Sequence, residues 1–185
     1  YWLIADNGWT KKDKASFKVH AKTIGNIKIK YFKRSKRLIK ILNEKKFKKD
    51  PINDFTVFCH GFIGKLAFGY DYINDNKKLD LKIKQIKKIK KSHLMYARST
   101  FYSCNTATKN EKGKSFAGRW SKRFWSSTLA YKGKTDYSGI RGTRFEQRIL
   151  YRQYPYGKIS PALYYPVKCD DAEEVKFIKT YYTQG

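Results

Sequence analysis

Acidic residues are scarce in this sequence. Only 15 Asp and Glu stand against 42 Lys and Arg, and the formal net charge is +27. A surface with this charge attracts anionic partners, which include nucleic acid, acidic proteins and anionic membranes. Because lysine supplies most of the charge, a solvated lysine coat without any partner is an equally good interpretation. The basicity belongs to residues 1–140, which contain 34 basic and 10 acidic residues.

Cysteines and long apolar runs are also few. Three cysteines, an odd number, predict no disulfide framework, and Cys59 and Cys104 lie in apolar runs where reduced thiols commonly sit. We therefore expect a reducing working compartment. No run reaches the about 18 apolar residues of a membrane span, and no signal-peptide pattern opens the chain. These absences predict a soluble protein, and the start within an apolar run suggests a domain cut from a longer polypeptide.

Aromatic residues, in contrast, are abundant. They make up 17% of a chain whose hydrophobic content is 41%. A basic tail without structure would lack the apolar surface that offsets the entropy of ordering, so this chain is expected to fold. Its length suits one core, and we expect a single domain over 1–185 with its core in 1–140. The extension 141–185 is expected to complete the sheet edge or the substrate groove.

Apolar periodicity predicts alternating strands and helices. The expected strands cover 1–5, 26–32, 55–59, 95–103 and 127–131, with a hairpin-like excursion at 65–72. Helices are expected from Ser35, over 77–91, from Ser115, over 141–151 and over 170–182. This order predicts an α/β fold, a three-layer sandwich in which helices flank a mostly parallel sheet.

His60 and Cys104 each come directly after an apolar strand. In open parallel sheets, the carboxyl ends of the strands converge on the ligand-binding crevice, so the two side chains are expected to meet there. A thiolate can attack a carbonyl, and an imidazolium can protonate the leaving amine. Gly61 has no Cβ and lets a substrate carbonyl approach the backbone. Its N–H and that of Cys104 would form the oxyanion hole.

These residues resemble a known class of enzymes. The runs Thr56–Gly61 (TVFCHG) and Phe101–Thr106 (FYSCNT) are similar to those of the caspase and clostripain clan of cysteine peptidases. The chain also resembles the caspase-like toxin domains at the C-termini of bacterial secreted polymorphic effectors. This resemblance rests on three segments: Tyr102–Thr106, Ser115–Ala117 and Tyr131–Tyr137. The resemblance spans about residues 1–140.

The resemblance implies a caspase-like cysteine endopeptidase with Cys104 as nucleophile and His60 as general acid/base. Relatives usually have Gly where this chain has Ala107, and arginine-specific members have an acidic residue where it has Tyr102, so specificity does not carry over. Asp6 and Asn105 are the candidate substrate-binding residues. An exported toxin acting in the cytoplasm of a target cell would have a protein substrate and an acidic immunity or inhibitor protein as partners.

The remaining candidates have plainer interpretations. Cys59 should face the core, Cys169 has no thiol nearby, and His20 and His93 lie in polar basic stretches. The stripe of Phe116, Trp120 and Phe124 is expected in the core. No Cys or His spacing predicts a metal site, and no cofactor is expected. The rival function is a basic nucleic-acid-binding or nuclease toxin domain, although its few carboxylates are scattered.

Overall fold

The structure is a computed structural model, and it describes residues 1–25, 27–70, 76–136, 167–168 and 173–177. The prediction for 141–151 therefore lies outside the described residues. The β-strands are β1 Trp2–Ala5, β2 Ile29–Phe32, β3 Asp54–Phe58, β4 His60–Phe62, β5 Lys65–Ala67, β6 Asp80–Lys82, β7 Arg98–Tyr102, β8 Thr128–Lys132, β9 Thr135–Asp136, β10 Val167–Lys168 and β11 Glu173–Phe177. The α-helices are α1 Lys11–Ile24, α2 Ser35–Leu42, α3 Lys46–Lys49 and α4 Phe116–Phe124.

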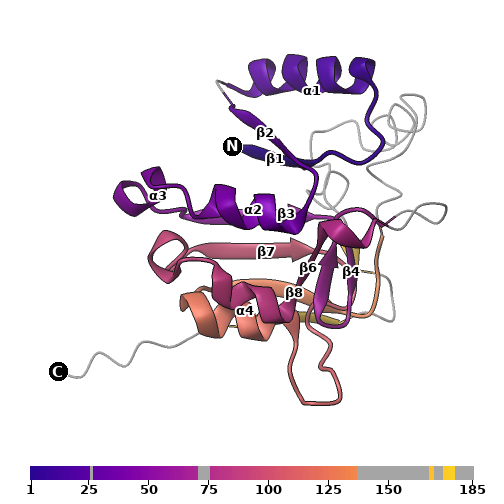
Figure 1. The fold of residues 1–185 in the computed structure, drawn as a ribbon. Helices are drawn as coiled ribbons and strands as arrows, with labels where there is room; N and C mark the ends of the chain where they lie inside the picture. Colours follow the sequence, from indigo (N-terminus) through magenta and orange to yellow (C-terminus); the bar gives the residue numbers. More distant parts are fainter. Residues whose placement is uncertain (26, 71–75, 137–166, 169–172, 178–185) are drawn as a thin grey trace, which may run out of the picture.

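A mixed sheet of four strands forms the centre of the molecule, in the order β11-β8-β7-β3. The strands β3, β7 and β8 are parallel, and β11 adds an antiparallel edge strand. The expected mostly parallel α/β arrangement is confirmed at this level. The strands β1 and β2 form a separate parallel pair, whereas the sequence predicted one sheet. Figure 1 shows α2 and α4 on the same side of the central strands.

Helix α4 fixes the covered face of this sheet through its aromatic stripe. Phe116, Trp120 and Phe124 are completely buried, as the sequence predicted. The Trp120 ring stacks on Phe55 of β3 with 4.9 Å between centroids, and its indole N–H donates to Ser99 of β7 at 2.9 Å. Because alternate strand residues face opposite sides, the contacts of one helix set the orientation of two parallel strands.

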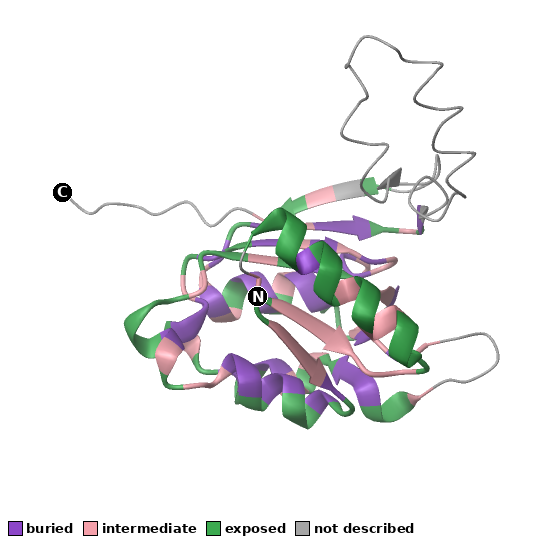
Figure 2. Cartoon of the chain, turned by 90° about the horizontal axis from the view of Figure 1, so that it is seen from above, coloured by how far each residue is buried: buried purple, intermediate pink, exposed green. Residues whose placement is uncertain are grey.

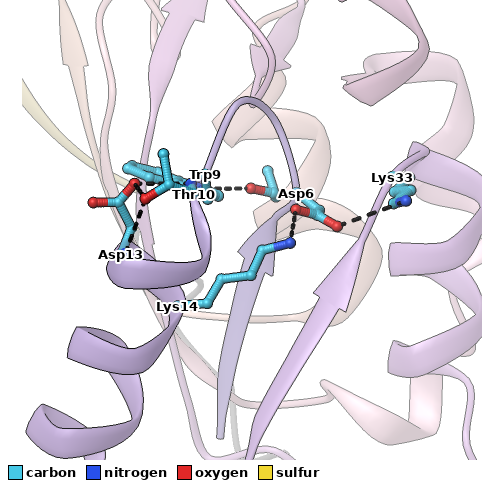
Figure 3. Close-up of polar contacts among 7 residues, drawn as sticks. Asp6, Trp9, Thr10, Asp13, Lys14 and Lys33 are labelled. Carbon is cyan, nitrogen blue, oxygen red and sulfur yellow. Dashed lines mark hydrogen bonds and ion pairs between the residues drawn. The ribbon is translucent and has the colours of Figure 1, made fainter.

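Helix α1 was not predicted, although a local signal for it is present. Thr10 and Asp13 form a capping box: the Asp13 N–H donates to Thr10 Oγ1, and the Thr10 N–H donates to the Asp13 carboxylate (Figure 3). Ala21 is the only residue of this helix that is buried. Because the apolar stripe of this helix is weak, the apolar periodicity of the sequence did not predict it. Figure 2 shows α1 and α2 on opposite sides of the β1–β2 pair.

Two predicted helices are wrong. Residues 77–91 form the short strand β6 and 3₁₀ helices at Lys77–Leu79, Ile83–Lys88 and Lys91–His93. The apolar spacing explains this, because Leu79 and Leu81 alternate as in a strand, while Ile86 and Ile89 recur every three residues. Within 170–182, the structure has β11, which pairs with β8 over five residues, so tertiary pairing overrides the local helical pattern.

The expected excursion at 65–72 is larger than a hairpin. It is a three-stranded antiparallel sheet, β4-β5-β6, that begins at His60, two residues after the end of β3. Within the described ranges, no helix is both long and apolar enough to cross a membrane. The fold thus places the two sequence candidates, His60 and Cys104, beyond the carboxyl ends of adjacent strands.

Candidate active site

His60 and Cys104 lie two residues beyond a paired position of neighbouring strands. In the parallel register of β3 and β7, Phe58 is opposite Tyr102. The chains remain adjacent past this pair, since Cys59 Sγ lies 3.4 Å from Ser103 Oγ. Gly61, the residue after the histidine, lies against Cys104, so the segment that carries His60 passes beside the cysteine. The topology therefore brings both sequence candidates to one edge of the sheet.

The backbone of Gly61 lies directly against that of Cys104. A Cβ built on Gly61 would lie only 2.8 Å from the Cys104 nitrogen, and it would collide with the Cys104 carbonyl oxygen. Both atoms belong to the backbone, so neither can move aside as a flexible side chain would. Only glycine permits this approach. The close contact between these two chain segments therefore requires glycine after the histidine.

The sulfur of Cys104 is held by Thr135, the first residue of β9. The Thr135 N–H points to Cys104 Sγ at 3.3 Å, and Thr135 Oγ1 lies 3.5 Å from the same sulfur. Asn105 adopts the left-handed conformation with φ of 55°, and its N–H donates to the Gly133 carbonyl at 2.7 Å. This tight turn directs the chain away immediately after the cysteine, which is only partly buried.

The imidazole of His60 packs against an aromatic side chain of the excursion. Its ring meets the Tyr70 ring edge-on at 5.0 Å, and Tyr70 meets Phe62 at the same distance. The other neighbours of His60 follow from the register. His60 is opposite Ala67, and Ala67 is opposite Asp80, so the three residues form one row across the small sheet.

Asp80 is an unusual member of this row, because it is a carboxylate buried to 3% exposure. One of its oxygens, Oδ2, accepts from Lys65 Nζ at 2.8 Å, whereas Oδ1 has no hydrogen-bond partner. A buried polar atom without a partner is rare and calls for an explanation. Two strand spacings separate Asp80 from His60, about 10 Å between backbones. Ala67, whose side chain is a single methyl group, stands between them in the row and is itself buried.

The second thiol near the site is inert. Cys59 packs against the hydrophobic core, as the sequence predicted. Burial raises the pKa of its thiol to about 12, and the hydrogen bond from Ser103 offsets only part of this effect. The Cys104 and Asp80 charges add to the rise in pKa, so both groups lie within electrostatic range of Cys59. A thiol that keeps its proton is a poor nucleophile.

The two candidate substrate-binding residues occupy different environments. Asp6 follows β1 and forms ion pairs with Lys14 at 2.7 Å and with Lys33 at 3.9 Å (Figure 3). Its neighbour Asn7 donates to the Gly69 carbonyl at 3.3 Å, which ties the end of β1 to the loop that carries Tyr70. Asn105 accepts from Thr108 Oγ1 at 3.4 Å, so its side chain participates in the turn after Cys104.

The other sequence candidates have structural environments. His20 is exposed, and His93 is buried with its Nδ1 2.9 Å from the Leu42 carbonyl oxygen. Cys169 lies outside the described residues. Among the residues that the structure describes, no three His, Cys, Asp or Glu side chains are grouped in a way that could hold a metal ion.

Three residues of the site were not singled out from the sequence: Thr135, Tyr70 and Asp80. Thr135 lies in the Tyr131–Tyr137 segment that carries part of the resemblance, and Gly133 marks the turn before it. Tyr70 and Asp80 come close to His60 through antiparallel pairings whose register the sequence does not specify. Comparison with family models, curated proteins and solved structures found no match for this chain.

We expect Gly61→Ala to displace the Cys104 loop. The added methyl group collides with backbone, so the variant should lose about 1–3 kcal/mol of stability, and its amide resonances should shift at Ser103, Cys104 and Thr135. Gly64→Ala is the control, since nothing lies within 4 Å of its added Cβ and only its φ of 77° adds strain. Heteronuclear NMR spectra compare the two. Unmoved resonances at Cys104 in Gly61→Ala would contradict the close approach.

The raised pKa of Cys59 predicts a loss of stability at high pH. Between pH 9 and about 12, the native thiol keeps a proton that the unfolded chain releases. Rising pH therefore favours unfolding, by up to about 1.4 kcal/mol per pH unit. Cys59→Ala removes this contribution, while the titration of the lysines is common to both proteins. Chemical denaturation from pH 8 to 11.5 should show a shallower decline for the variant, and parallel curves would refute the assignment.

Proposed function

We propose that this chain is a cysteine endopeptidase in which Cys104 is the nucleophile and His60 the general acid/base. The observation that carries the proposal is the contact between Gly61 and Cys104, which joins the two strand ends into one site. A dyad needs its thiol and its imidazole on adjacent, rigid elements, because the reacting groups must lie within hydrogen-bond reach in the substrate complex. The parallel pairing of β3 with β7 supports the proposal, because both residues follow adjacent strands.

The proposed reaction has two halves. The Cys104 thiolate attacks the peptide carbonyl carbon, and the carbonyl electron pair moves to oxygen, where the N–H groups of Gly61 and Cys104 stabilise it. The tetrahedral intermediate collapses to a thioester, and the leaving amine takes its proton from the His60 imidazolium. His60 then removes a proton from water, which attacks the thioester and releases the second product. The C–S bond breaks as the Cys104 thiolate leaves, and the thiolate and the His60 imidazolium are both regenerated.

We assign Asp80 to positioning His60. Asp80 has an oxygen without a hydrogen-bond partner and stands in the same row as His60, one position beyond Ala67, so its charge acts on the imidazole across the small sheet. A carboxylate there stabilises the imidazolium that forms when the histidine accepts a proton. Thr135 has the corresponding role for the thiol, because its N–H fixes the sulfur.

We further propose a caspase-like fold, an effector role, an acidic partner and a protein substrate. A caspase-like sandwich is supported by the parallel strands β3, β7 and β8 and by helices α2 and α4, which cover one face of them; the three-layer form needs a helical layer on the other face as well. The effector role rests on the resemblance of residues 1–140 to toxin domains. An acidic immunity protein would complement the charge of +27, because complementary potentials accelerate association. The substrate in this proposal is a protein of the target-cell cytoplasm.

Replacing Cys104 should abolish proteolysis without unfolding the protein. Purified wild-type protein, incubated with a bacterial lysate, should generate new peptide N-termini that mass spectrometry detects. Cys104→Ala and His60→Ala should each lower their formation by about a thousandfold or more, with melting curves close to wild type. Cys59→Ala is the matched thiol control and should retain activity. Proteolysis that persists in Cys104→Ala would contradict the mechanism. Degradation of RNA or DNA by that variant would favour a nuclease.

Removing the Asp80 charge should alter the pH dependence of the reaction. Asp80→Asn is expected to move the histidine-dependent limb of the pH profile of kcat/KM to lower pH, because the imidazolium loses a stabilising charge. Lys65→Met breaks the same ion pair but keeps the carboxylate, so it should lose stability without this shift. Cleavage of a substrate found in the lysate experiment provides the assay. Identical shifts in both variants would assign Asp80 a structural role only.

A further inference from the structure

A basic cavity opens at the carboxyl ends of β1 and β2. It has a volume of about 560 Å³, which lies in the range of small-molecule sites. Asp6 follows β1, Lys33 follows β2, and Tyr31 belongs to β2 itself. The other lining residues come from the residue before α2 and from its first turns: Arg34, Lys36, Arg37 and Lys40. Two parallel strands and the start of one helix thus form the walls.

The charge in this cavity is poorly balanced. Five cations line it against one carboxylate, Asp6, which Lys14 and Lys33 already share. Among the described residues, no ion pair involves the remaining four, Arg34, Lys36, Arg37 and Lys40. Like charges that converge on a concave surface repel one another and focus the positive potential. An anion inside the cavity would relieve this repulsion.

Two further features favour an anion with several acceptor oxygens. No side chain caps the N-terminus of α2, so the positive end of its dipole meets the arginine and lysine side chains at the cavity. The Tyr31 hydroxyl oxygen is buried and has no hydrogen-bond partner. The centre of its ring lies 5.2 Å from Nζ of Lys14, which forms an ion pair with Asp6. Hydroxyl, ammonium and guanidinium groups are all donors to phosphate oxygens.

We propose that this cavity binds a small molecule with two or more phosphate groups. The site is an open hollow of limited volume, which suits a compact ligand, whereas an extended nucleic acid would follow a longer stripe of charge. Two guanidinium groups, Arg34 and Arg37, can each hold phosphate oxygens in a bidentate way. The proposal does not depend on the peptidase proposal, since none of the lining residues belongs to the His60 and Cys104 dyad.

Calorimetric titration with tripolyphosphate tests the site, using the full chain at low ionic strength. The pocket variant carries Lys36→Gln, Arg37→Gln and Lys40→Gln, all on exposed positions of α2. The matched control carries Lys84→Gln, Lys87→Gln and Lys88→Gln, three exposed lysines outside the cavity, and loses the same charge. We expect one binding site in the wild type, a loss of affinity of about tenfold or more in the pocket variant, and little change in the control.

Several results would overturn the proposal. Equal losses in the two variants would mean diffuse attraction to a basic surface, and no saturable binding in the wild type would mean that the cavity holds no polyphosphate. Tighter, pocket-dependent binding of a single-stranded oligonucleotide or of an acidic peptide would assign the cavity to a macromolecular partner instead. Cys104→Ala should bind tripolyphosphate like the wild type, so failure of the peptidase proposal leaves this test unaffected.

Discussion

The parallel pairing of β3 with β7 is the constraint on which the other features of the site depend. Its register places Phe58 opposite Tyr102, and the two chains stay adjacent beyond that pair. Cys59 meets Ser103, and the backbone of Gly61 touches that of Cys104. A slip of one residue would turn every side chain to the other face of the sheet. The packing of Trp120 against Phe55 and Ser99 opposes such a slip, because it anchors both strands to one helix.

The sequence was sufficient for those parts of the fold whose signal is local. Strands β1, β2, β3, β7 and β8 and helices α2 and α4 were predicted because their apolar spacing matches one period over the whole element. The segment 77–91 was misassigned because it changes period, from two at Leu79 and Leu81 to three at Ile86 and Ile89. Helix α1 was missed because its signal lies in the Thr10 and Asp13 cap, and β11 because pairing with β8 decides its structure.

The residues of the candidate site likewise fall into those that local sequence signals predicted and those that they did not. His60, Gly61 and Cys104 follow apolar runs directly, so topology alone predicts that they lie at one edge. Thr135, Tyr70 and Asp80 reach them from segments 10 to 31 residues away through turns and antiparallel pairs. The Gly133 turn, the Tyr70 ring contact and the His60–Ala67–Asp80 row each depend on a register that the sequence does not encode in its pattern. Burial of Asp80 depends on the packing of all three small strands.

The alternation of strand residues gives the two cysteines near the site opposite properties. Cys59 and Cys104 are within electrostatic range of each other and both are partly buried, yet Cys59 packs against the core and Cys104 lies beside the Thr135 N–H. Burial makes the first thiolate too costly to form, since a charge in an apolar surrounding loses its hydration. The same sheet can therefore hold two thiols while presenting one of them for reaction. The side of the strand on which each cysteine lies thus distinguishes the proposed nucleophile, Cys104, from the thiol of Cys59.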